Sequence, residues 1–250
     1  MANRYSLKSK SRKKFLYRVF LLVMIFVLSY LVVFKTDYFN IKYIEVIGNK
    51  KLSYDSIVNA SLCNIGENIF RINIKNGQES IKRLSYIKNC QIKRKFPNKI
   101  LIEVEERKEM AVLPYSDKVA IIDREGYILA IKKSSKELKL PKIIGLEQIE
   151  MKVGSNIFSM IKRNDVYQFI NIGDQLDLLN KMEFIDFTDE KNIVFQTKDN
   201  TNVAFGSLDN VKYKLSFLIK IFEDLNEKGI KAKQIFFNKG ENPIIVTDNR

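Results

Sequence analysis

The amino-acid sequence predicts an α+β protein that consists of a single N-terminal transmembrane helix, a small mixed domain, and a larger mixed α/β domain with a C-terminal edge strand. Three patterns support this fold class. Residues 19–34 form a run of sixteen residues that is apolar except for Ser29 and the hydroxyl of Tyr30. Apolar and mostly charged residues alternate over residues 99–107, as in a half-buried strand. Apolar residues recur at helical spacing over residues 208–228.

The apolar run has the length and the flanks of a membrane anchor. Counted over residues 15–34, a helix is about 30 Å long, which matches the hydrocarbon core of a bilayer. Seven basic residues and no acidic residue precede the run, so we expect residues 1–14 to be a cytoplasmic tail, 15–35 the transmembrane helix, and 36–250 to lie outside. The run ends in Val-Val-Phe-Lys rather than in a small-residue cleavage site, which favours an uncleaved anchor. A buried helix of a soluble domain is the weaker alternative, because such helices are usually amphipathic.

The net charge of +14 is concentrated near this anchor. Residues 1–36 carry eight basic and no acidic residues, residues 37–107 thirteen against eight, and residues 108–250 twenty-two against twenty-one. Basic residues beside a membrane are attracted to anionic headgroups, so we expect the cytoplasmic membrane as a partner and no nucleic acid. The excess in the middle segment fits either an acidic envelope polymer or solvated strand faces.

Few residues are suited to catalysis or metal binding. The chain has two cysteines, Cys63 and Cys90, and no histidine, a set too small for a zinc site. The two thiols either form one disulfide or stay free in the core, and their spacing does not decide between the two. A Ser-His-Asp nucleophile is excluded, and the sequence contains no glycine-rich phosphate loop. We expect no catalytic residue, no cofactor and no metal.

Ser159 and Lys162 have the Ser-x-x-Lys spacing that brings a lysine beside a nucleophilic serine in penicillin-binding enzymes. The same spacing occurs at Ser11 and Lys14, and no Lys-Thr-Gly element accompanies either pair. Residues on a helix surface are therefore the favoured interpretation, and a serine-type cell-wall enzyme is the least favoured function.

The segment after the anchor shows the order β-α-α-β-β. Ser53 stands where a helix N-cap is expected, and Ile57, Val58 and Leu62 follow at the spacing of one buried face. Glu105 and Glu106 close the last strand beside Arg107 and Lys108, and we interpret them as a solvated hinge rather than as an acid–base pair. In chain order we expect a strand within residues 38–48, helices over 53–63 and 77–84, and strands over 87–95 and 99–107.

Four short motifs of this segment resemble one known domain. They are IEVIGN at residues 44–49, GENIF at 66–70, KRKFPN at 93–98 and IEVEER at 102–107. Together they are similar to the POTRA domain of the FtsQ/DivIB family of bacterial cell-division proteins. The resemblance implies a POTRA domain over residues 38–107.

The resemblance continues into the rest of the chain. An Asp-x-x-Gly turn at residues 123–126 and a Leu-Pro-x-Ile-x-Gly segment at 140–145 are similar to the start of the family's second domain, which implies an FtsQ/DivIB-type β domain over 108–250. Beyond them, local patterns predict a mainly helical stretch over residues 156–182, strands over 184–187, 192–197 and 202–205, a helix over 208–228, and strands over 234–237 and 243–246.

The strand that contains Phe236 and Phe237 is expected at the edge of its sheet, where unpaired backbone groups can accept a strand of another protein. The resemblance implies that this region binds the small division proteins FtsL and FtsB or DivIC. It places Phe236, Phe237, Lys239 and Gly240 at or beside that contact. The alternative is that the two phenylalanines simply alternate between core and surface.

The resemblance thus implies a bitopic, non-catalytic scaffold of the divisome that recruits and stabilises partner division proteins at the septum. It would be a single-pass protein of the cell membrane with a cytoplasmic N-terminus. A POTRA-bearing component of protein secretion or envelope assembly is the alternative, although no barrel-like series of alternating strands follows the POTRA-like segment.

Overall fold

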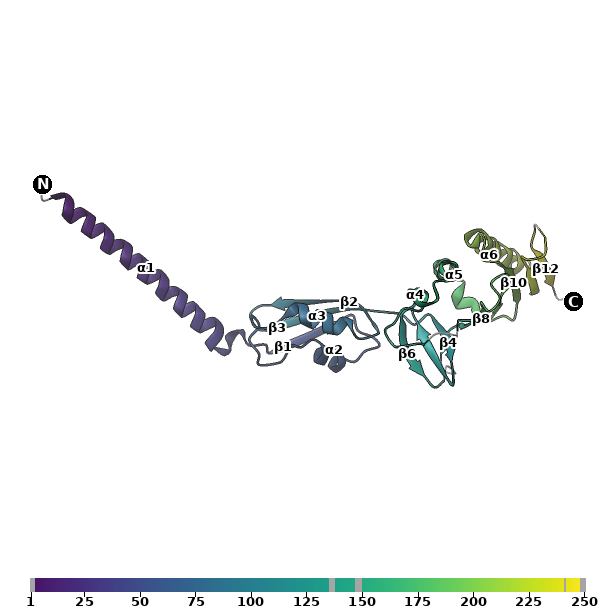
Figure 1. Ribbon diagram of the computed structural model, residues 1–250, viewed down its shortest axis with the longest axis horizontal. Helices are drawn as coiled ribbons and strands as arrows, with labels where there is room; N and C mark the ends of the chain where they lie inside the picture. Colours follow the sequence, from purple (N-terminus) through teal and green to yellow (C-terminus); the bar gives the residue numbers. More distant parts are fainter. Residues whose placement is uncertain (1–2, 135–137, 147–149, 241, 248–250) are drawn as a thin grey trace. The chain divides into compact units, whose positions relative to one another are not determined.

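The computed structural model describes residues 3–134, 138–146, 150–240 and 242–247. The chain divides into two compact units: Met1–Arg83 with Ile87–Glu106, and Leu84–Tyr86 with Arg107–Arg250 (Figure 1). The fold class expected from the sequence, α+β with one N-terminal apolar helix and a larger β-rich part after a small mixed domain, is confirmed.

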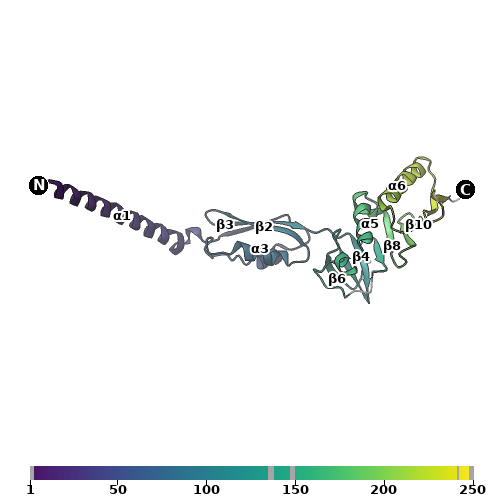
Figure 2. The same ribbon diagram turned by 45° about the horizontal axis from the view of Figure 1, so that its top comes forward.

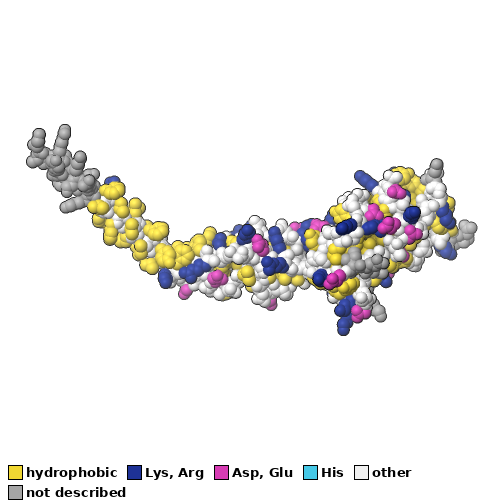
Figure 3. Space-filling view, in the orientation of Figure 1, with side chains coloured by type: hydrophobic (Ala, Val, Ile, Leu, Met, Phe, Trp, Pro, Cys, Tyr) yellow, Lys and Arg dark blue, Asp and Glu magenta, His cyan; other side chains and the backbone are white. Residues whose placement is uncertain are grey.

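Helix α1 (Asn3–Lys35) contains the predicted anchor. Its segment Lys14–Lys35 is the one helix, among the residues described, that is long and apolar enough to cross a membrane, and none of it is buried inside the protein. Figure 3 shows hydrophobic side chains along this segment, whereas charged side chains of both signs are scattered over the domains that follow. A helix that is apolar all round and unburied needs a lipid environment.

The first domain has the predicted β-α-α-β-β order. Its three strands lie in the order β1-β3-β2, with β1 parallel and β2 antiparallel to the central β3. Figure 2 shows α3 along one face of this sheet, and the buried side chains of Ile57, Ile81, Ile92, Ile100 and Ile102 form the core. The elements are η1 (Asp37–Phe39), β1 (Tyr43–Ile47), α2 (Tyr54–Ala60), α3 (Ile74–Lys82), β2 (Ile87–Lys95) and β3 (Lys99–Glu106).

Capping side chains set the limits of the two short helices. Ser53 Oγ accepts a hydrogen bond from Ser56 N, which confirms the predicted N-cap of α2. α3 begins at Ile74, three residues before the predicted start, because Asn73 caps it in the same way. Leu62 is exposed rather than buried as predicted, since α2 ends at Ala60 and Leu62 adopts a left-handed conformation.

Glu106 is a structural residue, so its interpretation as part of a solvated hinge is wrong. Its carboxylate accepts hydrogen bonds from the backbone N–H groups of Lys50, Lys51 and Leu52 at 2.7–2.9 Å. The last residue of β3 therefore fastens the loop that leads from β1 into α2.

The second domain is a nine-stranded sheet in the order β12-β11-β10-β9-β8-β7-β4-β5-β6. Four phenylalanines, Phe169 of α5 and Phe187, Phe195 and Phe205, are fully buried and pack with ring centroids 5.2–6.2 Å apart. The strands are β4 (Ala111–Tyr115), β5 (Lys118–Ile122), β6 (Ile128–Lys132), β7 (Lys142–Ile144), β8 (Met182–Asp186), β9 (Ile193–Thr197), β10 (Asn202–Gly206), β11 (Ala232–Phe236) and β12 (Ile244–Thr247). The helices are α4 (Ile157–Ile161), α5 (Asn164–Gln175), η2 (Leu179–Lys181) and α6 (Val211–Glu227).

The C-terminal edge of this sheet is β12, so the prediction that the strand with Phe236 forms the edge is wrong. β11 pairs in parallel with β10, with Val203 opposite Ile235. The chain then turns through Gly240, whose φ is +97°, and β12 returns antiparallel to β11. β11 is therefore covered on both sides, and the C-terminal edge strand lies one strand further along.

Candidate functional site

The backbone of β12 directs Ile245 toward the open side of the sheet. Phe237, just beyond β11, donates its N–H to Ala204 O of β10 at 2.9 Å. Neighbouring residues of a strand direct their backbone groups to opposite sides, so Phe236 faces β12, where it lies opposite Ile244. The backbone groups of Ile244 therefore form hydrogen bonds with β11. The next residue, Ile245, directs its N–H and C=O away from the sheet.

The side chains of this edge are apolar and exposed. Ile244, Ile245 and Val246 are 47%, 39% and 40% exposed. Successive side chains of a strand point to opposite faces, so both faces of β12 present apolar surface. An edge strand with an unpaired backbone and apolar side chains is a template for pairing with another strand.

The opposite edge of the same sheet is covered by the protein itself at the start of β6. Ile128 N of β6 donates to Ser155 O, and Gly154 N donates back to Ile128 O. Ser85 Oγ donates to the next carbonyl, Leu129 O, at 2.7 Å. Among the described residues of the two edge strands, the exposed large apolar side chains lie on β12 and not on β6, so β12 is the edge better suited to a partner.

The four candidate contact residues predicted from the sequence lie at the end of β11 and in the turn to β12, and their surroundings differ. The ring of Phe237 is half-buried and lies 5.9 Å from Phe205 in the core. Phe236 is also half-buried, and Lys239 Nζ lies 4.2 Å above the centre of its ring. Gly240 is exposed in the turn. Phe236 and Lys239 are therefore the more accessible pair, and sequence reasoning missed the exposed side chains of β12 itself.

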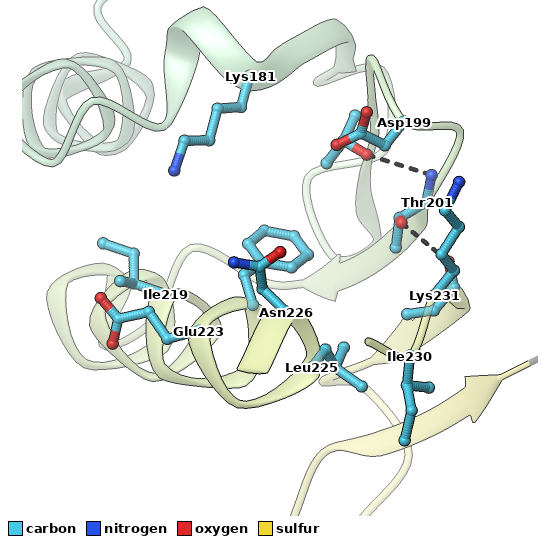
Figure 4. Close-up of a pocket in the computed structure, with 12 residues that line it drawn as sticks. Lys181, Asp199, Thr201, Ile219, Glu223, Leu225, Asn226, Ile230 and Lys231 are labelled. Carbon is cyan, nitrogen blue, oxygen red and sulfur yellow. Dashed lines mark hydrogen bonds between the residues drawn. The ribbon is translucent and has the colours of Figure 1, made fainter. Parts of the chain in front are cut away.

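A cleft of about 500 Å³ opens at the end of this edge (Figure 4). Ala232, which pairs with Thr247 of β12, forms part of its wall. Its other lining residues come from α6, η2, the β9–β10 turn and the start of β11. They combine an apolar floor with charges of both signs: Ile219, Phe222, Leu225 and Ile230, then Lys181, Lys231, Asp199 and Glu223.

Ser159 and Lys162 line a second, open cleft, but they do not form a catalytic pair. α4 ends at Ile161, and Lys162 takes a left-handed conformation with φ of 53°. The lysine therefore leaves the helical register that Ser-x-x-Lys spacing requires. The hydroxyl of Ser159 bonds instead to Asn156 Oδ1 at 3.3 Å, within the N-cap of the helix.

We expect that a fluorescent penicillin will not label this protein. The wild type and the Ser159→Ala variant should give the same blank lane on a denaturing gel of labelled membranes, because Lys162 leaves the helix and the hydroxyl of Ser159 bonds to Asn156. The penicillin-binding enzymes of the same membranes serve as the positive control. Labelling of the wild type that disappears in Ser159→Ala would restore the enzyme interpretation.

The two cysteines are buried and free. Burial raises the pKa of both thiols, that of Cys90 to about 11. Both therefore stay protonated at neutral pH, where they behave as small apolar core residues.

Comparison with known proteins identifies relatives over most of the chain. Residues 39–107 match the model of the FtsQ-type POTRA domain. The chain is 30% identical over 215 residues to the cell division protein DivIB of Clostridium tetani, which covers 85% of this chain and 81% of the relative. It is 31% identical over 199 residues to DivIB of Clostridium acetobutylicum, covering 80% and 79%. The cell division protein FtsQ of Syntrophotalea carbinolica is 24% identical over 201 residues, covering 78% and 69%.

Proposed function

The chain belongs to the FtsQ/DivIB family of bacterial cell-division proteins, and on that premise we propose that it is a non-catalytic scaffold that recruits and stabilises partner proteins in the divisome. Membership of this family makes it a single-pass membrane protein of cell division. The scaffold role and the choice of partners are the proposed part. The observation that carries the proposal is the open, apolar edge of β12.

The proposed binding mode is strand addition to β12. A partner strand placed beside Ile245 would satisfy its outward N–H and C=O and would cover apolar side chains on both faces of the edge. The turn with Phe236, Phe237, Lys239 and Gly240 borders one end of this edge, and the cleft at Ala232 borders the other. Proteins of the FtsL type and of the FtsB or DivIC type are the proposed partners.

The proposed topology follows from charge. The basic residues before the membrane segment favour a cytoplasmic location for residues 1–14, with 15–35 as the span. The POTRA domain over 38–107 and the β domain over 108–250 then lie outside the cytoplasm. We place the protein at the division septum, where its proposed partners act.

Co-purification tests this proposal. The full-length chain, tagged and solubilised in mild detergent, is expected to retain the FtsL-like and DivIC-like proteins of its own organism. A chain that ends at Gly240 keeps the anchor and the POTRA domain but lacks β12, so we expect it to lose both. If the wild-type chain retains neither partner, the scaffold proposal is wrong and the secretion alternative gains support.

A further inference from the structure

Aromatic rings form a continuous cluster where α1 leads into the POTRA domain. The ring of Phe70 is the centre of the cluster and lies 6.3 Å from Phe34 of α1, 5.3 Å from Phe39 and 5.2 Å from Phe96; Tyr38 lies 5.0 Å from Phe39. We call these five residues the aromatic collar. Tyr38, Phe70 and Phe96 are 61%, 41% and 59% exposed, so much of the collar is uncovered.

The exposed rings are held outward by ordered structure. Arg94 of β2 donates from Nε to Ile69 O at 2.7 Å and from Nη2 to Ile72 O at 2.9 Å. These bonds hold both ends of the short loop that carries Phe70. Phe96 lies in the tight turn between β2 and β3. The side chain of Arg94 thus helps to position the collar.

Two of the last four carbonyl groups of α1 accept hydrogen bonds from protein side chains. The last four carbonyls of a helix have no partner within the helix and usually bond to water. Here Thr36 Oγ1 donates to Val32 O at 2.5 Å, and Asn68 Nδ2 of the POTRA domain donates to Val33 O at 2.6 Å. Such bonds suit a helix end that lies at the boundary of the hydrocarbon region, where water becomes scarce.

Basic side chains surround the exposed rings. Lys35 follows the last ring of α1, Lys95 precedes Phe96, and both are exposed. The guanidinium of Arg71, the residue after Phe70, lies 5.8 Å from the centre of the Phe34 ring. Aromatic rings interleaved with lysine and arginine are the combination found at membrane–water interfaces.

We propose that the aromatic collar is a membrane-docking surface. Tyr38, Phe70 and Phe96 lie among the headgroups of the outer leaflet, and Arg71 and Lys95 face the phosphates of anionic lipids. The occupant is the lipid surface because the collar is continuous, through Phe34, with the segment that spans the bilayer. This contact goes beyond the binding of protein partners, and it holds the POTRA domain against the membrane instead of leaving it on a free tether.

The protein contains no tryptophan, so a single introduced tryptophan reports on its own site. We would place Phe96→Trp full-length protein in vesicles of phosphatidylcholine and phosphatidylglycerol whose acyl chains are brominated near the headgroups. Lipid contact predicts blue-shifted emission and the loss of most of the fluorescence intensity to bromine quenching. Phe70→Trp is a second reporter in a different loop.

Lys50→Trp is the matched control within the same domain. Lys50 is exposed, and its backbone N–H bonds to the carboxylate of Glu106 at the far end of β3. β3 has eight residues and is therefore roughly 25 Å long, which places this control well outside the headgroup region. Its emission should stay water-like and unquenched.

Two results would overturn the proposal. Emission that is water-like and quenched no more at positions 96 and 70 than at position 50 would show that the collar does not touch lipid. If quenching stays unchanged in vesicles without phosphatidylglycerol, the proposed contact of Arg71 and Lys95 with anionic lipids is wrong.

Discussion

Replacing Arg107 with methionine is expected to destabilise the second domain by about 3–5 kcal/mol, because it leaves a buried carboxylate without its counter-charge. Arg107 Nη1 donates to Asp123 Oδ2 at 2.6 Å and to Glu125 Oε2 at 2.8 Å. The side chains of Arg107 and Asp123 are only 11% and 3% exposed. The guanidinium also lies 3.8 Å from the centre of the Tyr127 ring.

The carboxylate of Asp123 cannot simply move into water after this change. Its other oxygen accepts hydrogen bonds from Glu125 N and Tyr127 N, which form the turn between β5 and β6. Burial alone would lower the pKa of Arg107, but the hydrogen bonds to Asp123 and Glu125 outweigh it and raise the pKa. The arginine is thus charged at every pH of interest, and its loss removes a full positive charge.

The measurement is urea unfolding of the full-length chain in mild detergent, followed by circular dichroism. Arg163→Met is the matched control, since Arg163 also pairs with a carboxylate, Asp165, but that partner is 41% exposed. We expect this control substitution to lower the free energy of unfolding by less than about 1 kcal/mol. If the two variants lose equal amounts of unfolding free energy, burial of Asp123 is not the source of the effect.

The first domain was predictable because its elements carry local signals. Ile100, Ile102 and Val104 alternate with solvent-facing residues, and they are buried as that pattern requires. Ser53 is the N-cap of α2. The errors within this domain came from equally local signals that were overlooked, such as Asn73 as the cap of α3.

The candidate site was less predictable because it depends on contacts between distant residues. Whether β11 or β12 forms the edge is decided by the pairing of β11 with β10, about thirty residues earlier in the chain. Nothing in the local pattern of Phe236 and Phe237 reports that pairing. Arg107 is a similar case, since its burial depends on Asp123 and Tyr127 across the β4–β5 hairpin.

Replacing Ile245 with proline is expected to weaken partner binding at least about tenfold, or ~1.4 kcal/mol, while leaving the sheet intact. Proline lacks the backbone N–H, and in Ile245 that group faces the open side of β12 rather than β11. The variant therefore removes a hydrogen bond to the incoming strand, and its ring obstructs close approach there. The residue before proline favours an extended conformation, which Ile244 already has in β12.

Ile245→Thr separates the backbone from the side chain. It keeps the N–H and the β-branched shape but reduces the apolar surface, so strand addition predicts a smaller loss of binding than for proline. Affinity is measured with the full-length chain and purified DivIC-like protein in detergent, and circular dichroism verifies folding. If both variants bind as the wild type does, the partner does not pair with β12. If threonine weakens binding as much as proline, the apolar side chain carries the contact, and docking against the face of β12 replaces strand addition as the mode of recognition.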